Sequence, residues 1–160
     1  MTRRAVIAAV GALFLLGINP AAHAAASRVS ETQLRDFLRR WLAAQNNHEF
    51  TRYSRMYAAD FTGIKRTTSG RTREYDRAGW MSDRRPMMAP SRHLHLSAEN
   101  VRYRRLQGGW AEIRFDQHFR TKNYGDWGPK LLRVRLASSG LLIVHEELLA
   151  SYAVPTGDCC

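Results

Sequence analysis

Seven side chains spread along the sequence could together bind a charged ligand that also contains amide groups. Aromatic rings, two cations, an amide and a carboxylate make up this set: Tyr57, Trp80, Arg84, Gln117, Tyr124, Lys130 and Glu146. Cations bind carboxylates, an amide pairs with peptide groups, and a carboxylate binds an ammonium group. The alternative is that some of them only join neighbouring strands, for example through a Lys130–Glu146 ion pair, because buried polar groups are normally satisfied within the protein.

Catalysis would require an acid or a base inside the same pocket, and Asp116 and His118 are the candidates. Both have the opposite parity to Phe115 and Phe119 on their strand, so the alternation predicts that they face outwards. A β-bulge would reverse this orientation, since bulges re-aim side chains beside active sites. The sequence therefore favours a non-catalytic binding role, and an enzyme that uses a pocket acid or base stays as the alternative.

Metal and phosphate chemistry have less support in the sequence. His93 and His95 share one face of a predicted strand, but no third ligand follows at a recognisable zinc-site spacing. There is also no Gly-rich phosphate loop and no nucleophile elbow. We therefore expect neither a metal ion nor another cofactor.

The segment from Ala111 to Leu136 must position Gln117 and Lys130. Six residues of one parity form the predicted buried face of its first strand: Ala111, Ile113, Phe115, Gln117, Phe119 and Thr121. Gln117 is the exception among them, because a buried amide without partners costs about 1–3 kcal/mol. A turn over residues 124–129 and a second strand with Leu132, Val134 and Leu136 on one face complete the predicted hairpin.

Helical spacing and capping residues predict three helices before this hairpin. Ser30 and Gln33 have the spacing of a capping box at the start of the first helix. An apolar stripe at helical spacing follows them: Leu34, Phe37, Leu38, Trp41 and Leu42. The other elements are expected in this order: a short helix over 50–60, a strand over 61–67, a helix over 77–85 capped by Asp76, a strand from 93, the hairpin, and a strand over 141–149.

These elements predict an α+β fold in which a cone-shaped, curved antiparallel sheet packs over about three N-terminal helices. The order resembles the nuclear-transport-factor-2-like (NTF2-like) fold from about Glu31 to Leu149. That resemblance implies a pocket at the open end of the cone. It does not select a function, because one fold hosts many activities.

A narrower motif is similar to the C-terminal domain of the cell-shape L,D-carboxypeptidase and L,D-transpeptidase proteins. It comprises Phe115-x-Gln117-x-Phe119-x-Thr121, Tyr124, Asp126, Lys130 and Leu132, with Trp80, Arg84 and Glu146 outside the hairpin. In those proteins the domain lies beside a peptidoglycan-cleaving domain, of which this sequence contains no counterpart. The resemblance implies that the seven side chains bind a peptidoglycan fragment or a wall-modifying partner. The alternative is a small enzyme of the polyketide-cyclase or dehydratase kind.

The N-terminal segment has the pattern of a signal peptide over residues 1–24. This segment starts with two basic residues, Arg3 and Arg4, continues with an apolar run from Ala5 to Ile18, and ends with small residues around His23. The alternative is an uncleaved anchoring helix. With cleavage, we expect a periplasmic or secreted protein that has no stable membrane span.

The mature chain is expected to hold one NTF2-like domain over residues 25–152 and a flexible tail over 153–160. The only two cysteines, Cys159 and Cys160, are adjacent in this tail. Neighbouring cysteines make a strained ring, so they form either an intermolecular bridge or free thiols. A homodimer through the outer sheet face is a further possibility for self-association.

The chain is strongly basic, with 25 Lys and Arg residues against 14 Asp and Glu residues and a net charge of +11. The basic residues are spread along the whole sequence, and an exported protein meets few nucleic acids, so we expect no nucleic-acid partner. Attraction to anionic envelope polymers or to a membrane surface is one interpretation of the charge. An arginine-rich surface that serves only solubility is the other.

Overall fold

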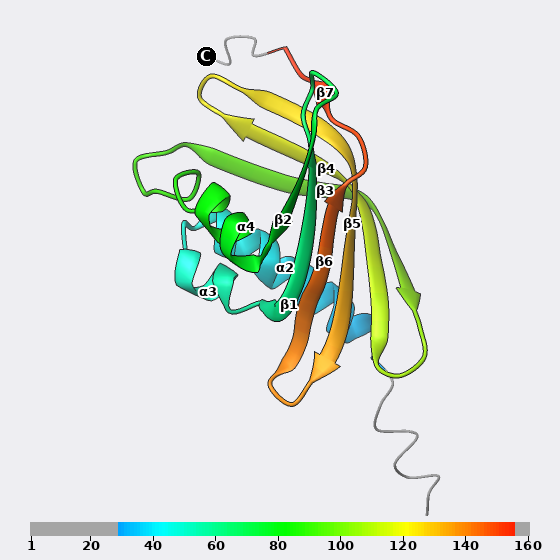
Figure 1. The fold of residues 1–160 in the computed structure, drawn as a ribbon. Helices are drawn as coiled ribbons and strands as arrows, with labels where there is room; N and C mark the ends of the chain where they lie inside the picture. Colours follow the sequence, from blue (N-terminus) through cyan, green and yellow to red (C-terminus); the bar gives the residue numbers. More distant parts are fainter. Residues whose placement is uncertain (1–28, 156–160) are drawn as a thin grey trace, which may run out of the picture.

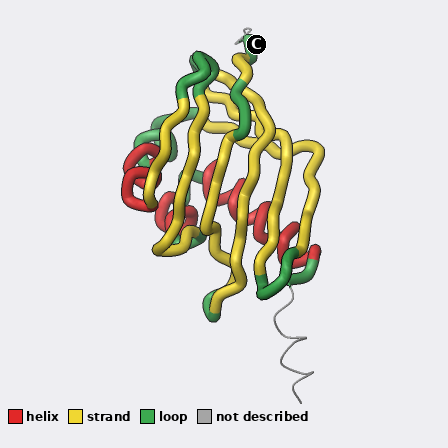
Figure 2. The backbone as a smooth tube through the Cα atoms, turned by 45° about the vertical axis from the view of Figure 1, so that its right-hand side comes forward, coloured by secondary structure: helices red, strands yellow, loops and turns green. Residues whose placement is uncertain are grey.

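The structure is a computed structural model that describes residues 29–155. Ten elements follow one another along this range: α2 (Glu31–Asn46), α3 (Phe50–Ser54), β1 (Tyr57–Arg66), β2 (Thr72–Asp76), α4 (Arg77–Arg84), β3 (Leu94–Arg105), β4 (Trp110–Thr121), β5 (Gly125–Ala137), β6 (Gly140–Leu148) and β7 (Tyr152–Ala153). The strands form one curved layer, and α2 lies across one face of it (Figures 1 and 2). The predicted α+β fold is therefore confirmed.

The strand order is β2-β1-β6-β5-β4-β3, and β7 pairs with the start of β5. All pairs are antiparallel except β1 with β6, so the sheet is mixed rather than wholly antiparallel as predicted. The parallel pair arises because β6 returns beside β1 only after the chain has passed through β2, α4 and three long strands. Such a long-range pairing leaves no local pattern in the sequence.

The first helix begins as its capping residues predict. The Ser30 hydroxyl accepts a hydrogen bond from the backbone N–H of Gln33, and the Gln33 side chain accepts one from the backbone N–H of Ser30. The apolar face of α2 is buried, and Trp41 packs edge-on against Phe115 of β4 with ring centroids 5.9 Å apart. This contact seats the helix against the concave face of the sheet.

The second predicted helix is too long. It ends at Ser54 rather than Asp60, and β1 already begins at Tyr57. The backbone N–H of Ile143 donates to the carbonyl of Met56, and Tyr57 pairs with Ile143 in the sheet. Pairing with β6, a contact across 86 positions of the chain, therefore overrides the helical spacing of the local sequence.

The hairpin of β4 and β5 keeps the predicted alternation but has a shorter turn. β5 begins at Gly125, so the predicted turn over 124–129 lies mostly inside a strand. The reason is a partner strand: Ala153 of β7 pairs with Asp126, and the N–H of Val154 donates to the carbonyl of Gly125. Ala153 and Val154, which the sequence assigns to a flexible tail, are thus hydrogen-bonded to the sheet.

Within residues 29–155, no helix is both long enough and apolar enough to cross a membrane. The predicted signal peptide, residues 1–24, and the cysteine pair Cys159 and Cys160 lie outside the described residues. Their predicted roles stay predictions.

Gly63 of β1 provides a test of how tightly the core is packed. A Cβ atom at this position would lie 2.5 Å from Cε3 of the fully buried Trp80. We expect Gly63→Ala to lower the free energy of unfolding by about 1–3 kcal/mol through overpacking. Urea unfolding measures the change. Gly125→Ala is the matched control, because its Cβ would meet nothing nearer than 3.5 Å, and an equal loss in both variants would contradict this reason.

Candidate functional site

A cavity of about 460 Å³ opens between the loop over residues 67–71, the end of α4, and strands β4 and β5. We call it the open-end cavity. Four of the seven predicted site residues line it: Arg84, Gln117, Tyr124 and Lys130. The structure therefore brings these four together around one space. The other three do not line it and lie buried behind its floor: Tyr57, Trp80 and Glu146.

Lys130 and Glu146 form an ion pair at the floor of the cavity. The Lys130 Nζ donates to Glu146 Oε1 at 2.5 Å, and the two residues are only 3% and 1% exposed. Burial lowers the pKa of Lys130, and the charge of Glu146 opposes this effect. Because β5 and β6 are adjacent, the ion pair spans two strands.

The second oxygen of Glu146 is occupied by a buried chain of hydrogen bonds. The Tyr57 hydroxyl donates to Glu146 Oε2 at 2.6 Å and accepts from the Trp41 indole N–H at 2.9 Å. It also lies 2.6 Å from the Tyr53 hydroxyl, which accepts from the Trp80 indole N–H at 3.0 Å. Tyr57 has one hydroxyl hydrogen, so Tyr53 is the donor between the two tyrosines.

These hydrogen bonds give a partner to the hydroxyl of each tyrosine, to the indole N–H of each tryptophan and to both oxygens of Glu146. Glu146 therefore has no free oxygen for the ligand ammonium group that the sequence analysis assigned to it. Burial, followed by the charge of Glu146, raises the pKa of both Tyr53 and Tyr57, so both keep their protons. Tyr57, Trp80 and Glu146 support the cavity floor rather than face a ligand.

Arg84 is the lining cation that combines burial with an unused donor. Its guanidinium lies over the Trp80 ring at 4.2 Å, and its Nε is buried without a hydrogen-bond partner within residues 29–155. The nearest carboxylate, Asp83, is 3.7 Å from this Nε and already accepts two hydrogen bonds from Lys65. A thioether contact to Met87 at 3.7 Å is a weak substitute.

Gln117 lies on the buried face of β4, only 7% exposed, between two aromatic residues as predicted. No residue in the described part of the chain hydrogen-bonds its side-chain amide, which borders the open-end cavity. At the mouth, the Tyr124 hydroxyl donates to Asp126 Oδ2 at 2.9 Å, and the Ser151 hydroxyl donates to the same oxygen at 2.8 Å. The floor thus presents a free amide, whereas Tyr124 is already paired.

The loop that forms the opposite wall was not predicted from the sequence. Arg71 and Thr68 line the cavity from this loop, and Gly70 holds its turn with a φ of +80°. The turn residues around Gly70 mark a loop in the sequence, but nothing local shows that it folds against β4. Arg66 also lines the cavity and is paired with Glu147, whose pKa it lowers against the opposing effect of burial.

Asp116 and His118 lie on the opposite face of β4 from the cavity, as the alternation predicts. Asp116 accepts a hydrogen bond from Asn100 at 2.7 Å, and His118 stacks on Trp127 with ring centroids 6.1 Å apart. The nearby bulge is in β3, between Glu99 and Arg102, so it does not turn β4 around. Among residues 29–155, no three His, Cys, Asp or Glu side chains are grouped as metal ligands.

The sequence matches no family model and no curated protein. Its structure, however, is similar to that of a proposed dehydratase of the NTF2-like family from Streptomyces avermitilis, with a TM-score of 0.62, 11% identity, and coverage of 78% of this chain and 96% of that one. An NTF2-like protein from Pseudomonas putida gives a TM-score of 0.61 at 13% identity, covering 86% and 90%. The chain has the NTF2-like fold.

The NTF2-like structures that resemble this chain also include parts of longer proteins. One is the helical cell shape determining protein Pgp2 from Campylobacter jejuni, with a TM-score of 0.59 and 20% identity over 74% of this chain. Another is Bd1075 from Bdellovibrio bacteriovorus, with a TM-score of 0.59 and 16% identity over 74% of this chain. This chain spans 41% and 43% of their lengths. At these identities the likeness shows the fold alone.

Proposed function

We propose that the open-end cavity binds a peptidoglycan fragment, or the equivalent part of a wall-modifying partner, without catalysing a reaction on it. The observation that carries this proposal is the buried Nε of Arg84, which has no hydrogen-bond partner within residues 29–155, in a side chain that lines the same cavity as the Gln117 amide. Buried polar groups normally have partners, so Arg84 indicates one group of the ligand, and the Gln117 amide, which forms no hydrogen bond within the described residues, is available to another. A carboxylate fits Arg84, and a peptide group fits Gln117.

Peptidoglycan stem peptides contain both of these groups at short spacing. The walls suit such a ligand because they combine cations with the aromatic rings of Phe119 and Tyr124. The similarity to Pgp2, a cell shape determining protein, gives this ligand class further support. We expect this chain to act in the cell envelope.

A second candidate function is acid–base catalysis of the dehydratase kind. Asp126 lines the cavity and is 9% exposed, and it is hydrogen-bonded to Tyr124 and Ser151. A carboxylate in this setting could move a proton, whereas Asp116 and His118 cannot reach the cavity. We favour binding because the carboxylate and ammonium groups at the cavity floor, Glu146 and Lys130, are paired with each other, whereas Arg84 and Gln117 offer groups that bind a ligand but do not act as acid or base.

Calorimetric titration with a purified disaccharide tetrapeptide tests the binding role. We expect saturable binding that Arg84→Gln weakens about 10-fold or more, because hydrogen bonds to charged groups contribute about 1.5–3 kcal/mol. Arg105→Gln, at the exposed far end of β3, is the matched control and should bind like the wild type. Absent binding, or equal affinity in Arg84→Gln, would refute the proposal. A change in the mass of the ligand after incubation would favour the enzyme instead.

A further inference from the structure

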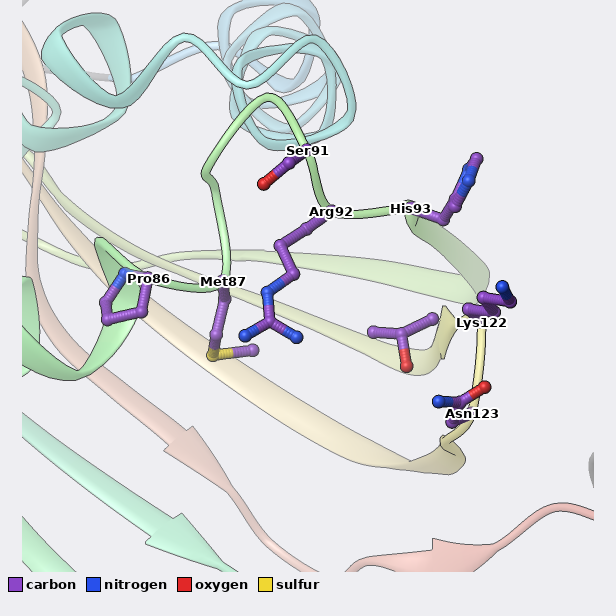
Figure 3. A pocket seen from close by; sticks show the side chains of 8 residues that line it. Pro86, Met87, Ser91, Arg92, His93, Lys122 and Asn123 are labelled. Carbon is purple, nitrogen blue, oxygen red and sulfur yellow. The ribbon is translucent and has the colours of Figure 1, made fainter.

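A second hollow, of about 360 Å³, adjoins the open-end cavity, and we call it the rim hollow. The loop between α4 and β3 supplies Met87 and Arg92 to its wall, and the end of β4 and the turn after it supply Thr121 and Lys122. Met87 and Thr121 line the open-end cavity as well, so the two spaces share walls. In Figure 3 the Arg92 guanidinium points into this hollow beside Met87, whereas the His93 ring points away.

Hydrogen-bonded turns hold both walls of the rim hollow in place. Met88 is 3% exposed and anchors the loop in the core, and the N–H of Arg92 donates to the carbonyl of Ala89 at 2.9 Å. On the other side, the N–H of Thr121 donates to the carbonyl of Tyr124 at 2.7 Å. Hydrogen-bonded backbone therefore borders the hollow on both sides.

The charge of the rim hollow is positive and uncompensated. Arg92 and Lys122 line it, and a third hollow of about 420 Å³ shares both residues and adds Arg120. No carboxylate lines either space, and none of the three cations forms an ion pair with another residue of the described chain. By contrast, Lys65 and Lys130 in the open-end cavity are each paired with a carboxylate.

Neutral hydrogen-bond donors complete the rim hollow. Ser91 and Asn123 line it and have no side-chain partner among residues 29–155. Cations next to hydroxyl and amide donors are the usual surroundings of a bound phosphate or carboxylate. An anion at this position would also offset the positive charges of Arg92 and Lys122, which both line the hollow.

We infer that the rim hollow is an anion-binding site for a phosphate or carboxylate group. The ligand of the open-end cavity then extends past Met87 and carries two anionic groups, one on Arg84 and the other on Arg92 and Lys122. This second statement rests on the proposed function, whereas the anion site itself does not. The ligand class is an extended molecule with two anionic groups separated by an uncharged segment.

Titration with inorganic phosphate, followed by nuclear magnetic resonance of the backbone amides, tests the anion site. We expect saturable shifts at Arg92 and at residues 121–123 in the wild type. These shifts should be lost in the double variant Arg92→Gln/Lys122→Gln and kept in Arg105→Gln. Shifts that do not saturate, that persist in the double variant, or that chloride reproduces at equal ionic strength would overturn the inference. Acetate, titrated in parallel, shows whether the site prefers a carboxylate to a phosphate.

Two tetrapeptide fragments that differ in one carboxylate test the extended ligand. One has the free α-carboxylate of its glutamate residue, and the other has the corresponding amide. We expect amidation to weaken binding about fivefold in the wild type and not at all in Arg92→Gln/Lys122→Gln. Equal loss in both proteins would overturn the two-anion ligand while leaving the proposed function intact. If neither fragment binds, the proposed function and the extended ligand both fail, and the phosphate titration still decides the anion site.

Discussion

Replacing Lys130 by methionine is expected to lower the free energy of unfolding by about 3–5 kcal/mol, because it leaves Glu146 as a buried charge without its partner. Both residues are at most 3% exposed, so water cannot replace the lost ammonium group. Urea unfolding followed by circular dichroism measures the loss. Lys65→Met is the matched control. It breaks a partly exposed pair with Asp83 and should cost about 1 kcal/mol or less.

A second substitution separates the charge effect from lost packing. The double variant Lys130→Met/Glu146→Gln removes the unpaired charge but keeps an oxygen that can accept from Tyr57. We expect it to be more stable than Lys130→Met alone by about 1–2 kcal/mol. If the double variant were the less stable of the two, the cost of Lys130→Met would lie in packing and not in the buried charge.

Tyr57→Phe is expected to lower the free energy of unfolding by about 3 kcal/mol, although it removes only one oxygen atom. That oxygen contacts three buried groups: the Trp41 indole N–H, the Tyr53 hydroxyl and the Glu146 carboxylate. Each group left without a partner costs about 1–3 kcal/mol, reduced where its neighbours can rearrange. In Tyr75→Phe, the control, only a 3.3 Å bond to Asp83 is lost, and Lys65 still binds that carboxylate. Comparable losses in the two variants would contradict the role of the buried chain.

The same substitution changes the dependence of stability on alkaline pH. Burial raises the pKa of Tyr57 above its ordinary value, so above about pH 10 the unfolded chain loses this proton while the folded protein keeps it. The contribution is therefore complete below pH 10 and declines as the pH rises further. Urea midpoints at pH 8, 10 and 11 should decline less in Tyr57→Phe than in the wild type. Parallel curves would show that Tyr57 does not keep its proton.

Local signals in the sequence were sufficient for several elements of this fold. Ser30 and Asp76 cap their helices as predicted, and the alternation of β4 correctly turns Gln117 inwards and Asp116 outwards. Capping and alternation depend on residues within a few positions of one another, so both can be recognised from the sequence alone. The prediction of a helix over residues 50–60 was wrong in its second half, because the backbone from Met56 onwards is hydrogen-bonded to β6.

The candidate site was likewise predicted only in part. Residue types and spacing predicted the four residues that share the open-end cavity, but they also predicted a ligand-binding carboxylate at Glu146. The Lys130–Glu146 ion pair, which the sequence offered as the alternative, is present and occupies one oxygen. The bond from Tyr57 to the other oxygen could not be predicted, because Tyr57 lies 89 positions away on another strand. Arg71 was missed for a similar reason, since its place in the wall depends on how a surface loop folds back.

The amino-acid sequence by itself determined the caps of α2 and α4, the buried face of β4, and the residue types available to a binding site. Only the tertiary structure decided which of these side chains are free. It satisfies Glu146 and Tyr57 within the core, leaves Arg84 and Gln117 facing the cavity, and places Arg92 beside Lys122 at the rim. The physical reason is that hydrogen bonds between distant strands and loops are set by the packing of the whole chain. Local periodicity reports only which face a residue occupies.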